Sequence, residues 1–277
     1  MRIPDRLQPL LEQGLIDEVM RPLMSGKEAA VYIVAASGKY CVAKVYKEAE
    51  NRSFRQRTAY TEGRQVRDSR QRRAMEKGSK FGKEQTESAW QTAEVDALYK
   101  LGAVGVRVPK PIAYSEGVLL MEVVLAPNGE AAPRLCDCNL TEAQAWNVHA
   151  FIIRQVVMML CAGTIHGDLS EYNVLIAWDG PMIIDLPQAV DASHNQSARA
   201  LLVRDVNNIS AYLARFAPEI AHTRFGEEMW ALYERGQLFP DSPLTGRWRG
   251  STRRADTRSV MREIDAAAQD AMRRRGR

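Results

Sequence analysis

A short segment in the middle of the chain carries polar side chains at a spacing that suits phosphate chemistry. Asp168 and Asn173 stand five residues apart, and Asp185 ends an apolar run about a dozen residues later. A carboxylate beside a substrate hydroxyl can accept its proton, while an asparagine and a second carboxylate can hold Mg²⁺ against nucleotide phosphates. Mg²⁺ prefers oxygen ligands together with waters and phosphates, so one Asn and one Asp are a reasonable protein contribution. The pattern predicts a site for a Mg-nucleotide.

A lysine stands in the middle of an apolar strand, where a charge is costly. Lys44 lies within Val42-Ala43-Lys44-Val45, and a buried ammonium group needs an anionic partner. Glu94 is the predicted partner because it shares one helical face with apolar side chains. Glu87, two helical turns earlier, is the alternative and is better placed to face water. A lysine in such a strand can also reach nucleotide phosphates as a point charge.

The first half of the chain is predicted to be rich in strands. One hairpin is expected from a strand that ends at Ala35 and a strand at 40–46, and a second from residues 112–124, whose last strand is continuously apolar. The turn at Ser25 and Gly26 can lay backbone N–H groups over phosphates, although surface hairpins of this composition are common. Apolar residues at helical spacing predict amphipathic helices at 7–20 and 88–102.

The second half is predicted to be mainly helical. A looser stretch at 126–139 predicts a hinge or linker, and Thr141 can cap a long core helix that ends at Gly163. The polar segment follows this helix and leads into two short strands, at 174–177 and 182–185. Two further amphipathic helices are expected at 198–216 and 219–238.

The composition of the 277 residues fits a globular protein with a real core, since 45% of them are hydrophobic. No apolar run approaches the roughly 18 to 20 residues that span a bilayer, and residues 1–6 lack the apolar core of a signal peptide. A cytoplasmic location without membrane contact is therefore expected. The four cysteines are too sparse for a disulfide framework, and Cys136 and Cys138 have no second ligand pair at zinc spacing.

Basic residues are concentrated in two segments, although the net charge is only +4. Residues 47–83 hold twelve Lys or Arg against five Asp or Glu, and residues 241–277 hold ten Arg against five Asp or Glu. The first segment is predicted to be a mobile insertion, either a solvated helix without function or a contact surface for nucleic acid or phosphorylated partners. The second is predicted to be partly disordered, or helical at 259–271.

Five motifs, in this order, make the chain resemble the RIO family of atypical serine/threonine protein kinases, in the type without an amino-terminal winged helix. They are Ser-Gly-Lys-Glu-Ala-x-Val-Tyr (25–32), Ala-Lys-Val-Tyr-Lys (43–47), Leu-Met-Glu (120–122), His-Gly-Asp-Leu-Ser-Glu-Tyr-Asn-Val-Leu (166–175) and Ile-Ile-Asp-x-x-Gln (183–188). The resemblance implies an α+β, two-lobed protein-kinase-like fold. A small β-rich N-lobe would occupy 1–125, with the basic insertion at about 47–88, a mainly helical C-lobe 126–240, and an arginine-rich tail 241–277.

The resemblance also implies cofactors and a role for each matching residue. ATP and Mg²⁺ would be the cofactors, with Mn²⁺ as an alternative metal. Asp168 would be the catalytic base, and Lys44, paired with Glu94, would contact the phosphates. Asn173 and Asp185 would hold the metal, and Asp185 would also be able to form an aspartyl-phosphate. The remaining nucleotide contacts would come from Ser25, Lys27, Glu28, Val31, Met121, Glu122, Val124 and Ser170.

The sequence departs from the ordinary protein-kinase pattern at several of these positions. Gly167 replaces the arginine that reads a phosphorylated activation loop, Ser170 replaces the usual lysine, and Leu-Pro-Gln follows Asp185 in place of Phe-Gly. Control by activation-loop phosphorylation is therefore not expected. The corresponding insertion of the family is flexible and can carry phosphoserine, which makes Ser53, Ser69 and Ser79 candidates here.

The expected activity is phosphoryl transfer from Mg-ATP to protein serine or threonine, including the chain itself, or to water through Asp185. A small-molecule phosphotransferase of the aminoglycoside or choline kinase type is an alternative, because His-Gly-Asp-Leu-x-x-x-Asn also occurs there. The Gly-Lys-Glu-Ala turn and the Asp-x-x-Gln ending argue against it. A third hypothesis is a nucleotide-switched RNA or ribosome assembly factor, whose arginines at 52–73 and 247–277 would touch the phosphate backbone.

Overall fold

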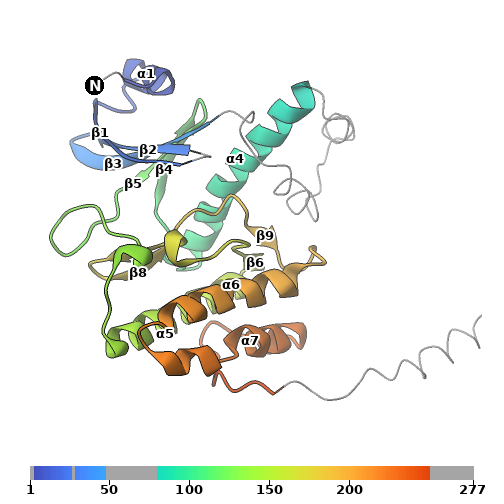
Figure 1. The fold of residues 1–277 in the computed structure, drawn as a ribbon. Helices are drawn as coiled ribbons and strands as arrows, with labels where there is room; N and C mark the ends of the chain where they lie inside the picture. The colour runs from blue at the N-terminus through green and yellow to red at the C-terminus, as the bar shows by residue number, and fades with distance from the viewer. Residues whose placement is uncertain (1–2, 27–28, 48–79, 250–277) are drawn as a thin grey trace, which may run out of the picture.

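A five-stranded antiparallel sheet forms the first half of the computed structural model, which describes residues 3–26, 29–47 and 80–249 (Figure 1). The strand order is β1-β2-β3-β5-β4, so β3 lies at the centre. Both predicted hairpins are confirmed, namely β2 with β3 and β4 with β5. The strands are β1 (Glu18–Ser25), β2 (Ala29–Ala36), β3 (Lys39–Tyr46), β4 (Pro111–Ser115) and β5 (Val118–Glu122).

The β2–β3 hairpin fixes where Lys44 lies. Ser37 and Gly38 form its two-residue turn with φ of 49° and 72°, the left-handed conformation that matches the twist of paired strands. This register pairs Lys44 with Val31 on one side, and β5 places Leu119 on the other. The lysine therefore projects from the interior of the central strand.

The helix predicted at 7–20 is wrong in its second half. A 3-10 turn, η1 (Asp5–Leu7), leads into α1 (Gln8–Glu12), and the chain turns at Gly14, whose φ is 68°. From Glu18 the chain forms β1, whose pairing with β2 contributes main-chain hydrogen bonds that local helical spacing does not reveal. Leu10 and Ile16 are nevertheless buried, in a small core against the sheet.

The helix α4 (Lys80–Ala103) crosses beside the sheet and carries the predicted partner of Lys44 (Figure 1). Val95, Leu98 and Leu101 are buried on one side of it. The helix begins eight residues before the predicted start at Ser88, so it includes the end of the insertion predicted at 47–88. Residues 48–79, with Ser53, Ser69 and Ser79, lie outside the described residues, as do residues 250–277.

The second half is built on three helices, α5 (Glu142–Cys161), α6 (Ala198–Leu213) and α7 (Phe225–Glu234). Thr141 caps α5 as predicted, because its hydroxyl accepts from the Gln144 N–H while the Gln144 side chain accepts from the Thr141 N–H. Within the described residues, no helix is both long enough and apolar enough to cross a membrane. A strand-rich first half and a mainly helical second half make the fold α+β, as predicted, while the domain boundaries given above remain predictions.

Two boundaries in this half differ from the prediction. The second of the two short strands is β8 (Gly180–Ile183) rather than 182–185, and it pairs with β7 (Val174–Ala177) as predicted. The helix predicted at 219–238 is split into the 3-10 turn η5 (Pro218–His222) and α7. The split falls at Thr223, which has extended backbone angles, and α7 ends just before Gly236, whose φ is 66°.

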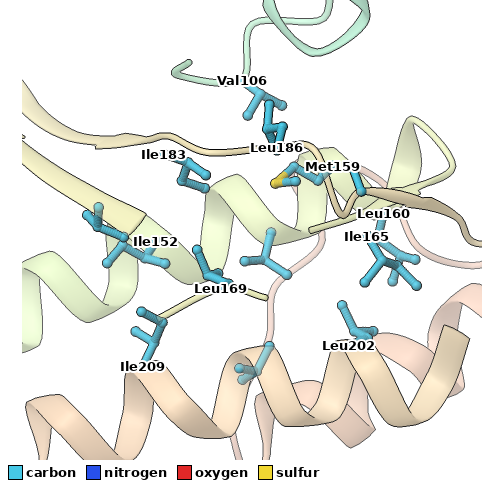
Figure 2. Packing of buried hydrophobic residues seen from close by; sticks show 14 of the residues in the cluster. Val106, Ile152, Met159, Leu160, Ile165, Leu169, Ile183, Leu186, Leu202 and Ile209 are labelled. Atoms are coloured by element: carbon cyan, nitrogen blue, oxygen red, sulfur yellow. The ribbon is translucent and has the colours of Figure 1, made fainter. Parts of the chain in front are cut away.

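The core between α5 and α6 also anchors the polar segment. Figure 2 shows Leu169 and Leu186 among buried side chains of these helices, and each is the neighbour of a candidate site aspartate. Both leucines are fully buried. The apolar core therefore fixes the backbone beside Asp168 and Asp185, while leaving these carboxylates at its surface.

His149 in α5 predicts a loss of stability in acid. It is buried against Ser210, and burial lowers the pKa of its imidazole from 6.5 to about 4. The unfolded chain therefore binds the proton first, so stability falls as the pH drops from about 6.5 to about 4, by an amount on the order of 3 kcal/mol. Denaturant unfolding between pH 7 and pH 4 should show this loss, and a His149→Gln variant should show a shallower pH dependence. Equal pH dependence in the two proteins would contradict the assignment.

Candidate active site

The segment from His166 to Asn173 lies between β6 (Thr164–Ile165) and β7, and His166 holds it against the residues that follow β8 and lead to Asp185. His166 Nε2 lies 3.0 Å from the carbonyl oxygen of Ile184, and the Asp168 N–H donates to His166 Nδ1 at 3.3 Å. Both contacts fit an imidazole that carries its proton on Nε2. The buried histidine thus acts as a spacer between the two aspartates of the motif.

Asp205 of α6 holds the backbone on both sides of Asp168. Its carboxylate accepts from the Gly167 N–H at 2.7 Å and from the Leu169 N–H at 3.2 Å, and the residue is only 1% exposed. Arg204 donates to the Gly167 carbonyl, and Asn208 donates to the Leu169 carbonyl at 3.2 Å. Sequence reasoning missed Asp205, although a carboxylate on the apolar face of a predicted helix was a usable signal.

Asn173 is fixed so that its amide oxygen is the free end of the side chain. Its Nδ2 donates to the Asp168 backbone carbonyl at 2.8 Å, and its own carbonyl accepts from the Ile184 N–H at 3.0 Å. The Ser170 carbonyl accepts from the Asn173 N–H at 3.0 Å, so the loop closes on itself. These bonds leave the Asn173 Oδ1 atom as a hard oxygen donor beside Asp185.

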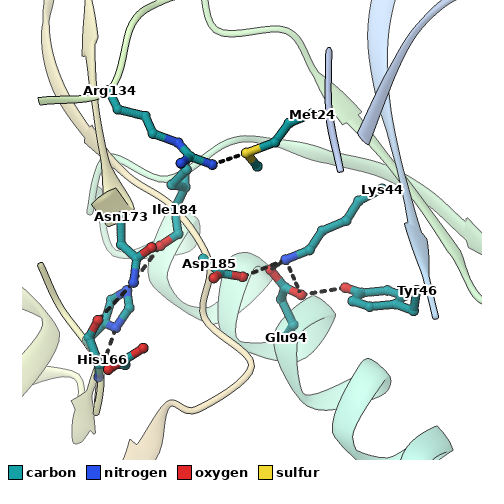
Figure 3. A network of polar contacts seen from close by, with 10 residues as sticks. Met24, Lys44, Tyr46, Glu94, Arg134, His166, Asn173, Ile184 and Asp185 are labelled. Atoms are coloured by element: carbon teal, nitrogen blue, oxygen red, sulfur yellow. Dashed lines mark hydrogen bonds and ion pairs between the residues drawn. The ribbon is translucent and has the colours of Figure 1, made fainter. Parts of the chain in front are cut away.

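The predicted ion pair between Lys44 and Glu94 is confirmed, and Asp185 joins it (Figure 3). Lys44 Nζ lies 2.7 and 2.9 Å from the two carboxylate oxygens of Glu94 and 2.7 Å from Asp185 Oδ1. Burial opposes the charge on Lys44, but the two carboxylates outweigh it and raise the pKa of the ammonium group. Burial likewise opposes ionisation of Asp185, but Lys44 holds the pKa of that carboxyl below its ordinary value.

The two aspartates of the motif differ in their environment. Burial raises the pKa of Asp168, in spite of the nearby His166 and Arg204, and the Asp185 charge adds to the increase. Asp185 has a φ of 67°, which is unusual for a residue with a side chain, so its backbone turns sharply at the end of the apolar run. Gly167 has a φ of 82°, and a Cβ there would lie 2.5 Å from the Gln188 carbonyl oxygen. The two site segments therefore touch backbone to backbone.

Tyr46 is a site residue that the sequence did not reveal. Its hydroxyl donates to Glu94 Oε2 at 2.5 Å, its ring lies 5.4 Å from Lys44 Nζ, and the residue is fully buried. Burial, followed by the Glu94 charge, raises the pKa of the Tyr46 phenol, which keeps it a donor. In a strand of alternating apolar residues, a tyrosine is indistinguishable from ordinary core.

A Tyr46→Phe variant should therefore be destabilised by about 1.5–3 kcal/mol, because it removes a hydrogen bond to a buried charge and leaves the shape of the ring. Tyr212→Phe is the matched control. The Tyr212 hydroxyl donates to the neutral carbonyl of Leu135 at 3.1 Å, so its loss should cost only about 0.5–1.5 kcal/mol. Urea unfolding of both variants measures the difference. An equal or smaller cost at Tyr46 would contradict a special role for its hydroxyl.

The residues predicted to contact adenine lie where the sheet meets the second half of the chain. Met121 and Glu122 end β5, and Glu122 is held by bonds with Lys110, whose backbone N–H donates to the Glu122 carboxylate at 3.0 Å. The Val124 carbonyl accepts from the Ala132 N–H at 2.8 Å, while the Val124 N–H donates to no described residue. That donor remains available for an acceptor on a ligand.

The predicted phosphate-loop residues are only partly described. Ser25 ends β1, and its hydroxyl accepts from Lys47 Nζ at 3.0 Å, while the Gly26 carbonyl accepts from the same ammonium at 2.6 Å. Val31 pairs with Lys44 across the strands. Lys27 and Glu28 lie outside the described residues. Ser170 contributes the carbonyl bond described above, and its hydroxyl makes no hydrogen bond with another described residue.

No group of three or more His, Cys, Asp or Glu side chains that could hold a metal occurs in the described part of the chain. The site instead offers an amide oxygen from Asn173 and a carboxylate from Asp185, and the Asp185 carboxylate also meets Lys44. Chemically, this arrangement suits a cation that shares its ligands with phosphate groups. Cys136 and Cys138 are free thiols, and burial raises the pKa of each.

Comparison with known proteins gives a consistent family. The family model described as the RIO domain matches residues 30–225. The chain is 30% identical over 211 residues to the serine/threonine-protein kinase rio1 of Schizosaccharomyces pombe, covering 76% of this chain and 41% of that protein. It is 35% identical over 209 residues to the RIO-type serine/threonine-protein kinase Rio1 of Haloferax volcanii, covering 74% and 67%. The chain thus spans between two fifths and two thirds of the length of these relatives.

Solved structures support the fold. The Rio2 kinase of Chaetomium thermophilum matches with a TM-score of 0.59 and 23% identity, over 80% of this chain and 65% of that one. The ADP/Mg²⁺-phosphoaspartate complex of the Rio2 kinase from the same organism matches with a TM-score of 0.55 and 21% identity, over 84% and 74%.

Proposed function

The chain belongs to the RIO family, and from this premise we propose that it transfers the terminal phosphoryl group of Mg-bound ATP. The acceptors are protein serine or threonine, including the chain's own, and water. One observation carries the proposal: Lys44, from the sheet, meets Asp185, from the second half, directly beside the segment that holds Asp168 and Asn173. A cation, two acidic side chains and an amide oxygen then face one place, as phosphoryl transfer requires.

Lys44 is the phosphate-binding cation in this proposal. Glu94 grips its ammonium group with both carboxylate oxygens, so the side chain stays in position when phosphate oxygens compete with Asp185 for it. Tyr46 in turn holds Glu94. The nucleobase would bind at Met121, Glu122 and Val124, where the Val124 N–H is available to an acceptor nitrogen, and Ser25 would lie over the phosphates.

Asn173 and Asp185 are the residues that would hold Mg²⁺. They fit it because both present oxygen atoms, and because the bond from Asn173 Nδ2 to the Asp168 carbonyl leaves Oδ1 as the only ligand atom of that amide. When bound, the ion neutralises negative charge on the nucleotide phosphates.

Asp168 is the proton acceptor in the proposed reaction. Its raised pKa makes it a better base than a carboxylate of ordinary pKa, and its backbone is fixed by His166, Asn173 and, through both neighbouring residues, Asp205. The Asp168 carboxylate takes the proton from the attacking hydroxyl oxygen, which forms a bond to the γ-phosphorus. The bond from the γ-phosphorus to the β–γ bridging oxygen breaks, and ADP leaves with that electron pair.

Asp185 is a second acceptor in the proposal. A Rio2 kinase has been solved with ADP, Mg²⁺ and phosphoaspartate, and in this chain Lys44 keeps Asp185 ionised. A carboxylate oxygen of Asp185 would attack the γ-phosphorus, ADP would leave, and water would then cleave the acyl phosphate to regenerate the carboxylate. The same chain would thus act as an ATPase.

The deciding experiment combines ATP turnover with the chemistry of the labelled protein. Purified protein is incubated with Mg²⁺ and γ-labelled ATP, and released phosphate and protein-bound label are measured. Label that hydroxylamine removes reports an acyl phosphate, whereas hydroxylamine-stable label reports serine or threonine. If the protein shows no ATP turnover and carries no bound label, the proposal is rejected. Stoichiometric ATP use that depends on an added amine or sugar would favour the small-molecule phosphotransferase.

Ribosome or RNA association remains a prediction from the sequence, because most of the arginines concerned lie outside the described residues. A cytoplasmic location is likewise a prediction from the sequence. Co-sedimentation with ribosomal particles across a salt series would test the association, since phosphate contacts weaken steeply with salt.

A further inference from the structure

Arg134 is a half-buried cation near the site, and it makes no ion pair with another described residue. It lies in the connection that was predicted as a linker, and no motif of the sequence drew attention to it. Its guanidinium group contacts the thioether sulfur of Met24 (Figure 3). A thioether is a weak acceptor, whereas a guanidinium carries five N–H donors. Most of the hydrogen-bonding capacity of the Arg134 guanidinium is therefore unused.

The base of the Arg134 side chain is fixed by the helical half of the molecule. Arg134 forms a backbone bridge with Leu175 of β7, and the preceding Pro133 carbonyl accepts from the Ile176 N–H at 2.9 Å. The following residue, Leu135, is fully buried, and its carbonyl accepts the Tyr212 hydroxyl. Because β7 begins directly after Asn173, the position of Arg134 is tied to the candidate metal ligand.

The side chain reaches from this anchor toward the phosphate side of the site. Met24 precedes Ser25 and Gly26, the start of the predicted phosphate loop. In Figure 3, Arg134 lies above and to the left of Asp185, and Lys44 reaches Asp185 from the right. The positive charge of Arg134 is also close enough to contribute to lowering the pKa of Asp185. Lys44 forms ion pairs with two carboxylates, Glu94 and Asp185. Arg134 forms none with the described residues, so its positive charge is the one left to be neutralised by a ligand.

We propose that Arg134 is a further phosphate-binding residue, whose guanidinium group binds oxygens of the terminal phosphoryl group of the nucleotide. The planar fork of arginine matches two phosphate oxygens, and such charge-assisted pairs are stronger than neutral hydrogen bonds. On binding, Arg134 exchanges the Met24 sulfur for phosphate oxygens, so that it and Lys44 both hold the phosphates. This inference rests on the proposed function, because it requires a nucleotide in the site.

A purely structural role makes a different prediction. If Arg134 only ties the sheet to the helical half through Met24, then Met24→Leu should have the same effect as Arg134→Met. If Arg134 binds phosphate, Met24→Leu should bind nucleotides like the wild type, since the charge remains. Arg154→Met is the matched control, because Arg154 is an exposed arginine on α5 outside the site.

The test is a set of equilibrium affinities, measured with Mg²⁺, for AMP, ADP and a non-hydrolysable ATP analogue. Arg134→Met is expected to weaken the affinity for the ATP analogue by about tenfold or more while changing the affinity for AMP by less than about twofold. Arg134→Lys should recover part of the lost affinity. Equal losses for the three nucleotides, or none, would overturn the inference, as would the same loss in Met24→Leu. Wild-type protein that binds none of the three would instead reject the proposed function.

Discussion

Replacing Asp168 with asparagine is expected to lower the rate of ATP-dependent phosphoryl transfer to protein by about 10²- to 10⁴-fold, the usual contribution of a positioned general base. Asparagine has nearly the shape of aspartate but cannot accept the proton. The loop should survive the change, because the bonds that fix it, from the Asp168 N–H and to the Asp168 carbonyl, use backbone atoms. The affinity for ADP is therefore expected to stay within about twofold of wild type.

Single-turnover transfer of labelled phosphate measures this effect apart from product release. Asp241→Asn is a suitable control, since Asp241 is exposed and lies outside the site. Formation of the acyl phosphate should be less affected than transfer to serine or threonine, because a carboxylate nucleophile has no proton to lose. Transfer to protein at the wild-type rate would show that Asp168 is not the base.

Asp205→Ala is expected to have the second largest effect, on stability and on turnover together. It leaves the Gly167 and Leu169 N–H groups without their acceptor in a buried place, and each unsatisfied donor costs about 1–3 kcal/mol. The variant should therefore lose about 2–6 kcal/mol of unfolding free energy, as measured with urea. Asp205→Asn retains one acceptor oxygen and should recover part of this loss.

The effect on turnover separates a positioning role from a merely stabilising one. At a temperature where Asp205→Asn is fully folded, kcat should fall while KM for ATP changes little, because the nucleotide contacts proposed for Lys44 and for Met121, Glu122 and Val124 are untouched. A variant that is less stable but keeps the wild-type kcat when folded would show that Asp205 supports the fold and not the geometry of Asp168.

The sequence located those site residues whose chemistry is at odds with their local surroundings. Lys44 and Glu94 were both charges in apolar patterns, and their pairing followed from the cost of burying either alone. Tyr46 and Asp205 were missed for opposite reasons. A tyrosine in a strand looks like core, and the acceptors and donors it meets become apparent only when α4 packs beside β3. Asp205 binds backbone groups 36 and 38 residues away, which no side-chain motif records.

The errors in the fold have a similar origin. Residues 7–20 do have helical spacing of apolar side chains, but those from Glu18 onward are recruited into β1 by pairing with β2, a non-local interaction. In contrast, the hairpins and the capped helix α5 were predicted well because turn and cap residues act locally.

The contact between Gly167 and Gln188 has a consequence for protein engineering. With no room for a Cβ at position 167, the path of one segment depends on the path of the other. Residues 166–173 and 183–188 therefore form one transferable unit. A chimaera that exchanges both segments with those of another family member keeps the fit, whereas a chimaera that exchanges one of them inherits a clash or a gap at this point.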